Sequence, residues 1–82
     1  MILDKINLII ALEFKIKPEQ VNQKMRLVED LGADSLRKVE CLMKLEEAFS
    51  IEIPDSEARE LITIGDIINY VERKTGALSK ER

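Results

Sequence analysis

LGADSL, residues 31–36, is the stretch around which this chain is organised. It stands where a polar segment gives way to a strongly helical pattern. Gly32 frees the backbone for a turn, and the side chain of Asp34 or of Ser35 can accept hydrogen bonds from the first free amides of a helix. Taken by itself, the hexapeptide predicts the start of a helix that continues to about Phe49.

The apolar residues of that helix fall on two stripes, at about 100° per residue. One narrow stripe is expected to face the core and consists of Cys41, Leu42, Leu45 and Phe49. A second stripe lies nearly opposite and is flanked by Glu40 and Glu47; it consists of Leu36, Val39 and Met43. A helix that only builds a core needs no second stripe, and this one lines up with Ser35, so it indicates a surface for partners. Scattered surface hydrophobic residues, which need no explanation, are the alternative.

The segment before this helix contains an earlier helix and a long connection. Residues 2–14 form the earlier helix, with an apolar stripe at steps of three and four made of Ile2, Ile6, Ile9, Ile10 and Phe14. Three further side chains widen the stripe, so we expect burial on more than one side: Leu3, Leu8 and Leu12. The connection covers residues 15–34, and its expected anchors to the core are Ile16, Val21, Leu27 and Val28.

The last third of the chain predicts a turn and two more helices. Pro54 closes a turn over residues 50–55, and a short third helix is expected over residues 56–61. Thr63 and Asp66 match a capping box that opens a fourth helix, which Gly76 ends. The inner face of this helix is expected to hold Ile64, Ile67, Ile68 and Val71. Residues 1–76 therefore form one domain, and residues 77–82 form a flexible polar tail.

Composition excludes several classes of function. The 82 residues carry a net charge of −3 and contain no histidine, which excludes Ser-His or Cys-His nucleophiles and every metal site that contains histidine. We expect no metal site at all. The single cysteine, Cys41, allows no internal disulfide and is expected to pack inward. Nucleic-acid binding needs a basic face, and none is present. No apolar run spans a membrane and the start lacks signal-peptide features, so a cytoplasmic protein is expected.

Ser35 lacks the surroundings of a catalytic nucleophile. A serine hydroxyl needs a base to react near neutral pH, and no side chain is placed to serve as one. The segment has neither the second glycine of a nucleophile elbow nor the Gly-Lys-Ser/Thr of a phosphate-binding loop. We therefore expect that the chain is not an enzyme and that another enzyme modifies Ser35, which is exposed at the start of a helix.

Several segments together resemble the acyl carrier protein family across residues 2–75. The matching segments are EDLGADSL at 29–36, LEEAF at 45–49, IEIPD at 51–55 and TIGD at 63–66. The resemblance implies an all-α, four-helix bundle with a long first loop and a short third helix. It also implies that a phosphopantetheinyl transferase, the holo-carrier synthase, moves 4'-phosphopantetheine from coenzyme A to Ser35. Asp34 would assist this modification by helping to coordinate the transferase's magnesium.

The resemblance also implies a cargo pocket and a set of partners. Acyl groups would ride as thioesters on the arm and fold into a pocket lined by Leu27, Leu42, Leu45, Phe49, Ile53, Ala58, Leu61 and Ile67. Plain core packing is at least as good an explanation for each of these. Acyl-transfer and chain-elongation enzymes of fatty-acid, specialised lipid or polyketide synthesis would bind a monomeric carrier through Leu36, Arg37, Val39, Glu40, Met43 and Glu47. An unmodified helical adaptor using the outer stripe, and an aminoacyl or peptidyl carrier, are the alternatives.

The charge of the second helix departs from the family. Carriers of fatty-acid synthesis are usually acidic there, whereas three cations balance three carboxylates in this helix: Arg37, Lys38 and Lys44 against Glu40, Glu46 and Glu47. Because complementary charge sets encounter rate and partner choice, the balance suggests a specialised carrier. Its dedicated partner would place acidic residues opposite Arg37 and Lys44.

Overall fold

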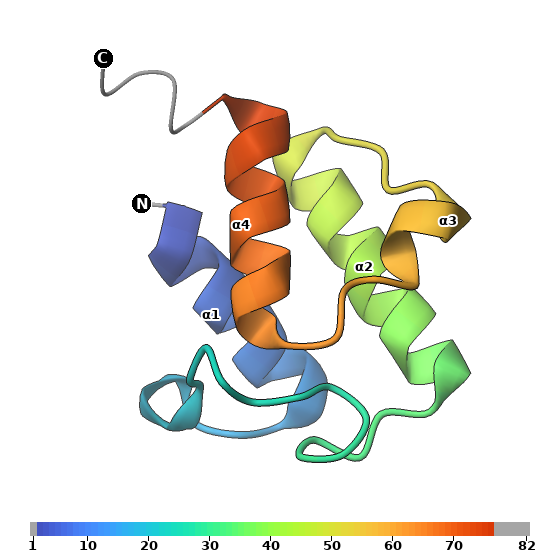
Figure 1. Ribbon diagram of the computed structural model, residues 1–82. Coiled ribbons are helices and arrows are strands. Elements are labelled where there is room, and N and C mark those ends of the chain that lie inside the picture. Colours follow the sequence, from blue (N-terminus) through green and yellow to red (C-terminus); the bar gives the residue numbers. More distant parts are fainter. Residues whose placement is uncertain (1, 77–82) are drawn as a thin grey trace.

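The computed structural model describes residues 2–76 and is all-α within that range (Figure 1). A one-turn 3₁₀ helix interrupts the long connection. The helices are α1 (Ile2–Phe14), η1 (Pro18–Gln20), α2 (Ser35–Phe49), α3 (Asp55–Ala58) and α4 (Ile64–Thr75). The prediction of four helices with a long first loop and a short third helix is confirmed. The predicted flexible tail, residues 77–82, lies outside the described residues.

Helix α1 is buried on one side only. Ile6 and Ile10 are fully buried where α1 packs against α2 and α4, which lie to one side of it in Figure 1. The prediction of burial on more than one side is wrong, because three leucines are exposed: Leu3, Leu8 and Leu12. These leucines do not share one side of α1, since the nine positions from Leu3 to Leu12 turn the helix by about half a revolution.

The long connection is held by backbone hydrogen bonds to the segment between α3 and α4. Leu27 N donates to the Ile62 carbonyl at 3.0 Å, and Ile64 N donates to the Met25 carbonyl at 2.9 Å. Leu27 is fully buried, whereas Val28 is exposed. The prediction that Val28 anchors the connection to the core is therefore wrong. Leu27 and Val28 lie in a turn in which Asp30 N donates to the Arg26 carbonyl at 2.9 Å and Gly32 N donates to the Val28 carbonyl at 3.1 Å, and this turn leaves Val28 on the outside. The other two expected anchors, Ile16 and Val21, are half-buried.

Helix α3 is shorter and earlier than predicted. It covers Asp55–Ala58 rather than residues 56–61. After Ala58 the chain continues in tighter turns, in which Leu61 N donates to the Ala58 carbonyl at 3.1 Å. Leu61 is nevertheless buried and Ala58 is half-buried. Both side chains therefore face the core as expected, although Leu61 is not in a helix.

Helix α4 begins and ends at the predicted signals. The Thr63 hydroxyl accepts from Asp66 N at 3.0 Å, and the Asp66 carboxylate accepts from Thr63 N and Ile62 N, each at 3.1 Å. These backbone donors, with that of Thr63 first, lower the pKa of Asp66. Gly76 follows the helix with a φ of 75°, a left-handed conformation that glycine adopts without strain. The predicted inner face is buried, together with Tyr70: Ile64, Ile67, Ile68 and Val71.

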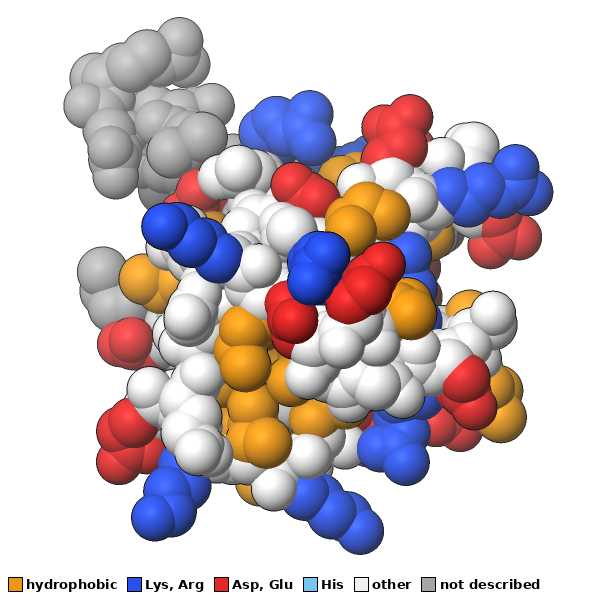
Figure 2. All heavy atoms as spheres, turned by 60° about the horizontal axis from the view of Figure 1, so that its bottom comes forward, with side chains coloured by type: hydrophobic (Ala, Val, Ile, Leu, Met, Phe, Trp, Pro, Cys, Tyr) orange, Lys and Arg blue, Asp and Glu red, His pale blue; other side chains and the backbone are white. Residues whose placement is uncertain are grey.

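All four helices and the long connection contribute to one core. The largest fully buried side chains are Ile6, Ile10, Leu27, Leu45, Ile64, Ile67, Val71 and Cys41. Figure 2 turns the lower end of Figure 1 forward and shows hydrophobic side chains gathered in a band, with charges of both signs around it. Among residues 2–76, no helix has the length and apolar character that crossing a membrane requires.

Candidate functional site

Ser35 is the first residue of α2 and its side chain is exposed. The preceding residue, Asp34, is the N-cap: its Oδ1 accepts a hydrogen bond from Arg37 N at 2.8 Å. Either Asp34 or Ser35 was a possible cap from the sequence, and the structure assigns that role to Asp34. The Ser35 hydroxyl is therefore not needed to start the helix.

The segment before Ser35 forms a tightly bonded turn. Ala33 is buried and its N–H donates to the Leu27 carbonyl at 2.9 Å. Gly32 has a φ of 72°, in the left-handed region that favours glycine. Asp30 accepts from Arg26 N at 2.8 Å and pairs with the Arg26 guanidinium at 3.3 Å, and the side-chain hydrogen bond from Arg26 lowers the pKa of Asp30. These contacts fix the backbone that presents Ser35.

A small cleft lies beside this turn. It has a volume of about 290 Å³ and is lined by Phe14, Lys15, Leu31, Gly32, Asp34 and Arg37. Lys15 ends α1 with a φ of 59°, which is unusual for a residue with a side chain. The end of α1 and the start of α2 thus meet next to Ser35.

The two apolar stripes of α2 differ sharply in exposure. The inner residues Cys41, Leu42 and Leu45 are at most 5% exposed, whereas the outer residues are at least half exposed: Leu36 (66%), Val39 (50%) and Met43 (55%). The outer face also carries the exposed side chains of Glu40 and Glu47. Cys41 packs inward as predicted, and burial, with a smaller effect of Glu13, raises the pKa of its thiol to about 12.

Glu13 of α1 engages both cations on the neighbouring flank of α2. Lys44 Nζ lies 3.3 Å from Glu13 Oε1, and the Arg37 guanidinium donates to the Glu13 carbonyl oxygen at 2.9 Å. Arg37 Nε also lies 4.0 Å from Glu13 Oε2. The side chain of Glu13 is only 9% exposed, compared with 46% for Arg37 and 60% for Lys44. No local pattern in the sequence indicates this role of Glu13, because the contact joins residues that are far apart along the chain.

The structure brings the eight residues of the predicted cargo pocket into one cluster. Six are buried and two, Phe49 and Ala58, are half-buried against that core: the six are Leu27, Leu42, Leu45, Ile53, Leu61 and Ile67. A larger hollow of about 800 Å³ lies at the surface between α3 and α4, and only Leu61 of the eight lines it. The eight residues thus form a packed core. Their positions fit both explanations, plain core packing and the lining of a cargo pocket.

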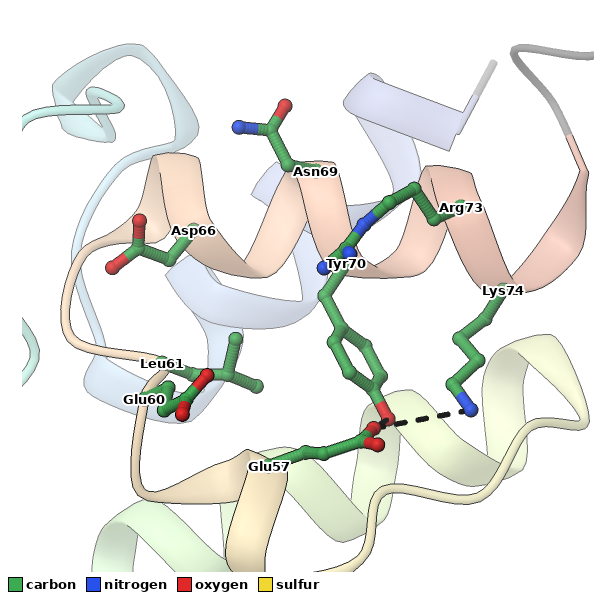
Figure 3. Close-up of a pocket in the computed structure, with 8 residues that line it drawn as sticks. All are labelled: Glu57, Glu60, Leu61, Asp66, Asn69, Tyr70, Arg73 and Lys74. Atoms are coloured by element: carbon green, nitrogen blue, oxygen red, sulfur yellow. Dashed lines mark hydrogen bonds and ion pairs between the residues drawn. The ribbon is translucent and has the colours of Figure 1, made fainter.

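Tyr70 fastens α3 to α4 within that surface hollow (Figure 3). Its hydroxyl donates to the Glu57 carboxylate of α3 and lies 3.3 Å from the Glu52 carbonyl oxygen. Lys74 reaches the same carboxylate at 3.9 Å. Burial, followed by the Glu57 hydrogen bond, raises the pKa of Tyr70 to about 12. The only sign of this contact in the sequence is a tyrosine on the flank of the apolar stripe of α4.

Comparison with known proteins identifies the class of this site. The family model described as "Phosphopantetheine attachment site" matches residues 4–71. The acyl carrier protein of Wolinella succinogenes is 48% identical over 71 residues, which cover 87% of this chain and 93% of that protein. The acyl carrier protein of Campylobacter curvus is 44% identical over 72 residues, which cover 88% and 94%. That of Campylobacter fetus is 44% identical over 71 residues.

A phosphopantetheine-binding carrier is the class that the fold and these matches define. The chain belongs to the acyl carrier protein family. The prosthetic group of this class is a covalently attached 4'-phosphopantetheine.

Proposed function

We propose that this chain carries acyl groups as thioesters on a 4'-phosphopantetheine arm attached through Ser35 Oγ. The observation that carries the proposal is the position of Ser35, which is exposed at the first residue of α2 directly after the capping Asp34. The relatives named acyl carrier protein favour an acyl cargo over an aminoacyl or peptidyl one. The arm would supply a terminal thiol, on which the cargo is held.

The residues around Ser35 suit attachment by a separate transferase. In this step the Ser35 oxygen forms a new bond to the phosphorus of the pantetheine phosphate, the pyrophosphate bond of coenzyme A breaks, and adenosine 3',5'-bisphosphate leaves with the electron pair. The hydroxyl proton passes to the transferase or to water. Asp34 uses Oδ1 for the helix cap, so Oδ2 is available to assist the transferase's magnesium. We propose no catalysis by this chain itself, since it supplies no base to Ser35.

The outer face of α2 would then serve the enzymes that act on the arm. The transferase and the acyl-transfer and chain-elongation enzymes are the proposed partners, and the proposed contact residues are Leu36, Arg37, Val39, Glu40, Met43 and Glu47. These residues are proposed because they are exposed on the same side of a helix that begins at Ser35. The eight core residues grouped above are the proposed cargo lining. Ile67, as a large side chain in that group, would limit its volume. A monomeric state and a cytoplasmic location stay predictions from the sequence.

Intact mass measurement after incubation with coenzyme A and a broad-specificity phosphopantetheinyl transferase tests the attachment site. Wild type is expected to gain the mass of the arm, and Ser35→Ala is expected to gain nothing while it stays folded. Ser56→Ala changes another exposed serine at a helix start and is the matched control, which should load fully. Loading of Ser35→Ala would disprove the site, and no loading of wild type would favour the unmodified adaptor.

Asp34 can be tested separately as a cap and as a helper in loading. Asparagine caps helices about as well as aspartate, whereas alanine costs about 1 kcal/mol. Asp34→Asn is therefore expected to keep the stability of wild type but to load more slowly, because it lacks the carboxylate. Asp34→Ala should be less stable than wild type and should also load more slowly. Equal loading rates for Asp34→Asn and wild type would show that Asp34 is only a cap.

A further inference from the structure

Helix α1 exposes an apolar edge beside α2. Leu12 is the most exposed large hydrophobic residue within the described range, at 70%, and Leu8, one turn earlier, is 50% exposed. Single exposed leucines are ordinary. Leu12, however, forms one wall of a groove between two helices, and that placement sets it apart from Leu3 at the other end of α1.

The groove joins α1 to the outer face of α2. One hollow of about 350 Å³ is lined by Ile9, Leu12, Glu13, Lys44, Glu47 and Ala48. A second hollow, also of about 350 Å³, is lined by Glu13, Glu40, Met43, Lys44 and Glu47. Because the two share Glu13, Lys44 and Glu47, they form one continuous depression. It runs from Leu12 of α1 to Met43 on the outer stripe of α2.

The charges along this depression are not balanced as the sequence of α2 suggests. Arg37 and Lys44 are both held by Glu13, as described above. Glu40 and Glu47 are exposed and form no ion pair with any residue between 2 and 76. Arg37 and Lys44 are therefore already paired within the chain, whereas Glu40 and Glu47 remain available to a partner.

We propose that α1 is part of the docking surface, a role that rests on the proposed carrier function. The occupant is an enzyme acting on the arm of Ser35, whose surface places an apolar side chain in the groove beside Leu12 and a basic side chain against Glu47. Charge complementarity favours a basic partner here, and the shared lining makes the groove continuous with the outer stripe of α2. The acidic partner expected opposite Arg37 and Lys44 stays a prediction from the sequence, and its carboxylates would have to compete with Glu13 for those two cations.

The proposed apolar contact at Leu12 is tested by measuring the KM of a chain-elongation enzyme from Wolinella succinogenes for the loaded carrier. Leu12→Ser is compared with Leu3→Ser, since the nine positions between them turn the helix by about half a revolution. Leu12→Ser is expected to raise KM roughly tenfold, which corresponds to about 1.4 kcal/mol, with kcat unchanged. Leu3→Ser is expected to match wild type.

Loading of each variant is first measured by intact mass, so that a failure at Ser35 is distinguished from a failure of the groove. A loaded Leu12→Ser variant with the KM of wild type would overturn the proposal. Equal increases for Leu12→Ser and Leu3→Ser would also overturn it, because the effect would then be a general loss of apolar surface.

The proposed contact between Glu47 and a basic side chain of the partner is tested with the same enzyme at low and high salt. Glu47→Gln is expected to raise KM several-fold at low salt, and the difference from wild type should narrow at high salt, because exposed charges are screened over about 10 Å at 0.1 M. Glu29→Gln removes an exposed carboxylate from the long connection and is the matched control. Equal effects of the two variants would show that only net charge matters and would overturn the contact at Glu47.

Discussion

The inner and outer faces of α2 carry similar apolar side chains in different surroundings. Leu45 is fully buried against the core, whereas Met43, two positions earlier, is 55% exposed. Burial of apolar surface stabilises the fold, so the inner face accounts for stability. The outer face contributes little to stability and is available for binding. Two residues of similar hydrophobicity on one helix thus have different consequences, which depend on the elements packed around the helix.

The flank of α2 that faces α1 is a third environment. Arg37 and Lys44 lie there with partly exposed side chains, but their shared partner, Glu13, is nearly buried. Cation and carboxylate are therefore part of the contact between α1 and α2. The same two cations look like free surface charges when α2 is considered alone.

The largest expected difference between the faces is in stability. Leu45→Ala should lower the free energy of unfolding by about 2–5 kcal/mol, because it leaves a cavity in the core. Met43→Ala should change it by no more than about 0.5 kcal/mol, as is usual for surface sites. Urea denaturation measures both changes in the free energy of unfolding, provided that the variants have the same m-value as wild type. Similar losses for the two variants would mean that Met43 is part of the core and would remove the basis for a binding face.

A smaller effect is expected on the flank that faces α1. Arg37→Glu combined with Lys44→Glu places two carboxylates beside the nearly buried Glu13, and we expect a loss of about 1–3 kcal/mol from unpaired and opposed charge. Adding Glu13→Gln should restore part of that loss. If the double variant is as stable as wild type and Glu13→Gln has no further effect, the ion pairs contribute nothing to the contact.

A matched control separates the loss of these ion pairs from a general change in net charge. Lys17→Glu combined with Lys24→Glu makes the same change in net charge on the long connection, where both lysines are exposed, and should leave stability within about 0.5 kcal/mol of wild type. The helix variant also makes α2 more acidic. From the sequence we predict faster transfer by fatty-acid-synthesis enzymes and slower transfer by a dedicated partner, an effect that should shrink with salt.

The last expected effect concerns the Cys41 thiol and appears only at alkaline pH. The pKa of Cys41 is raised from 9.0 to about 12, and that of Tyr70 from 10.0 to about 12. Between about pH 9 and 12 the unfolded chain loses these protons while the folded chain keeps them. Stability should therefore be fully present below pH 9 and fall as pH rises toward 12. Cys41→Ala should reduce the slope of that fall, measured by urea denaturation at several pH values, and an unchanged slope would contradict the raised pKa.

Local signals predicted the long helices well. The bounds of α1 and α2, the capping box at Thr63 and the end of α4 at Gly76 agree with the structure. Each depends on residues within about one turn of one another: periodic apolar side chains, a capping side chain or a glycine. For the short helix α3, the predicted start was one residue late and the predicted end three residues late, because its end is set by turns that pack Leu61 into the core rather than by a local stop signal.

The class of fold, the exposed serine at a helix start and the two apolar stripes of α2 could all be predicted from the order of the residues. Three features could be recognised only in the folded chain: α1 is open along Leu8 and Leu12, Glu13 pairs with Arg37 and Lys44 of α2, and Tyr70 fastens α3. Periodicity and capping are properties of neighbouring residues, so they can be found in the chain as written. Which side of a helix is covered, and which charge finds a partner, depends on contacts between residues far apart in sequence, and these exist only after the helices have packed together.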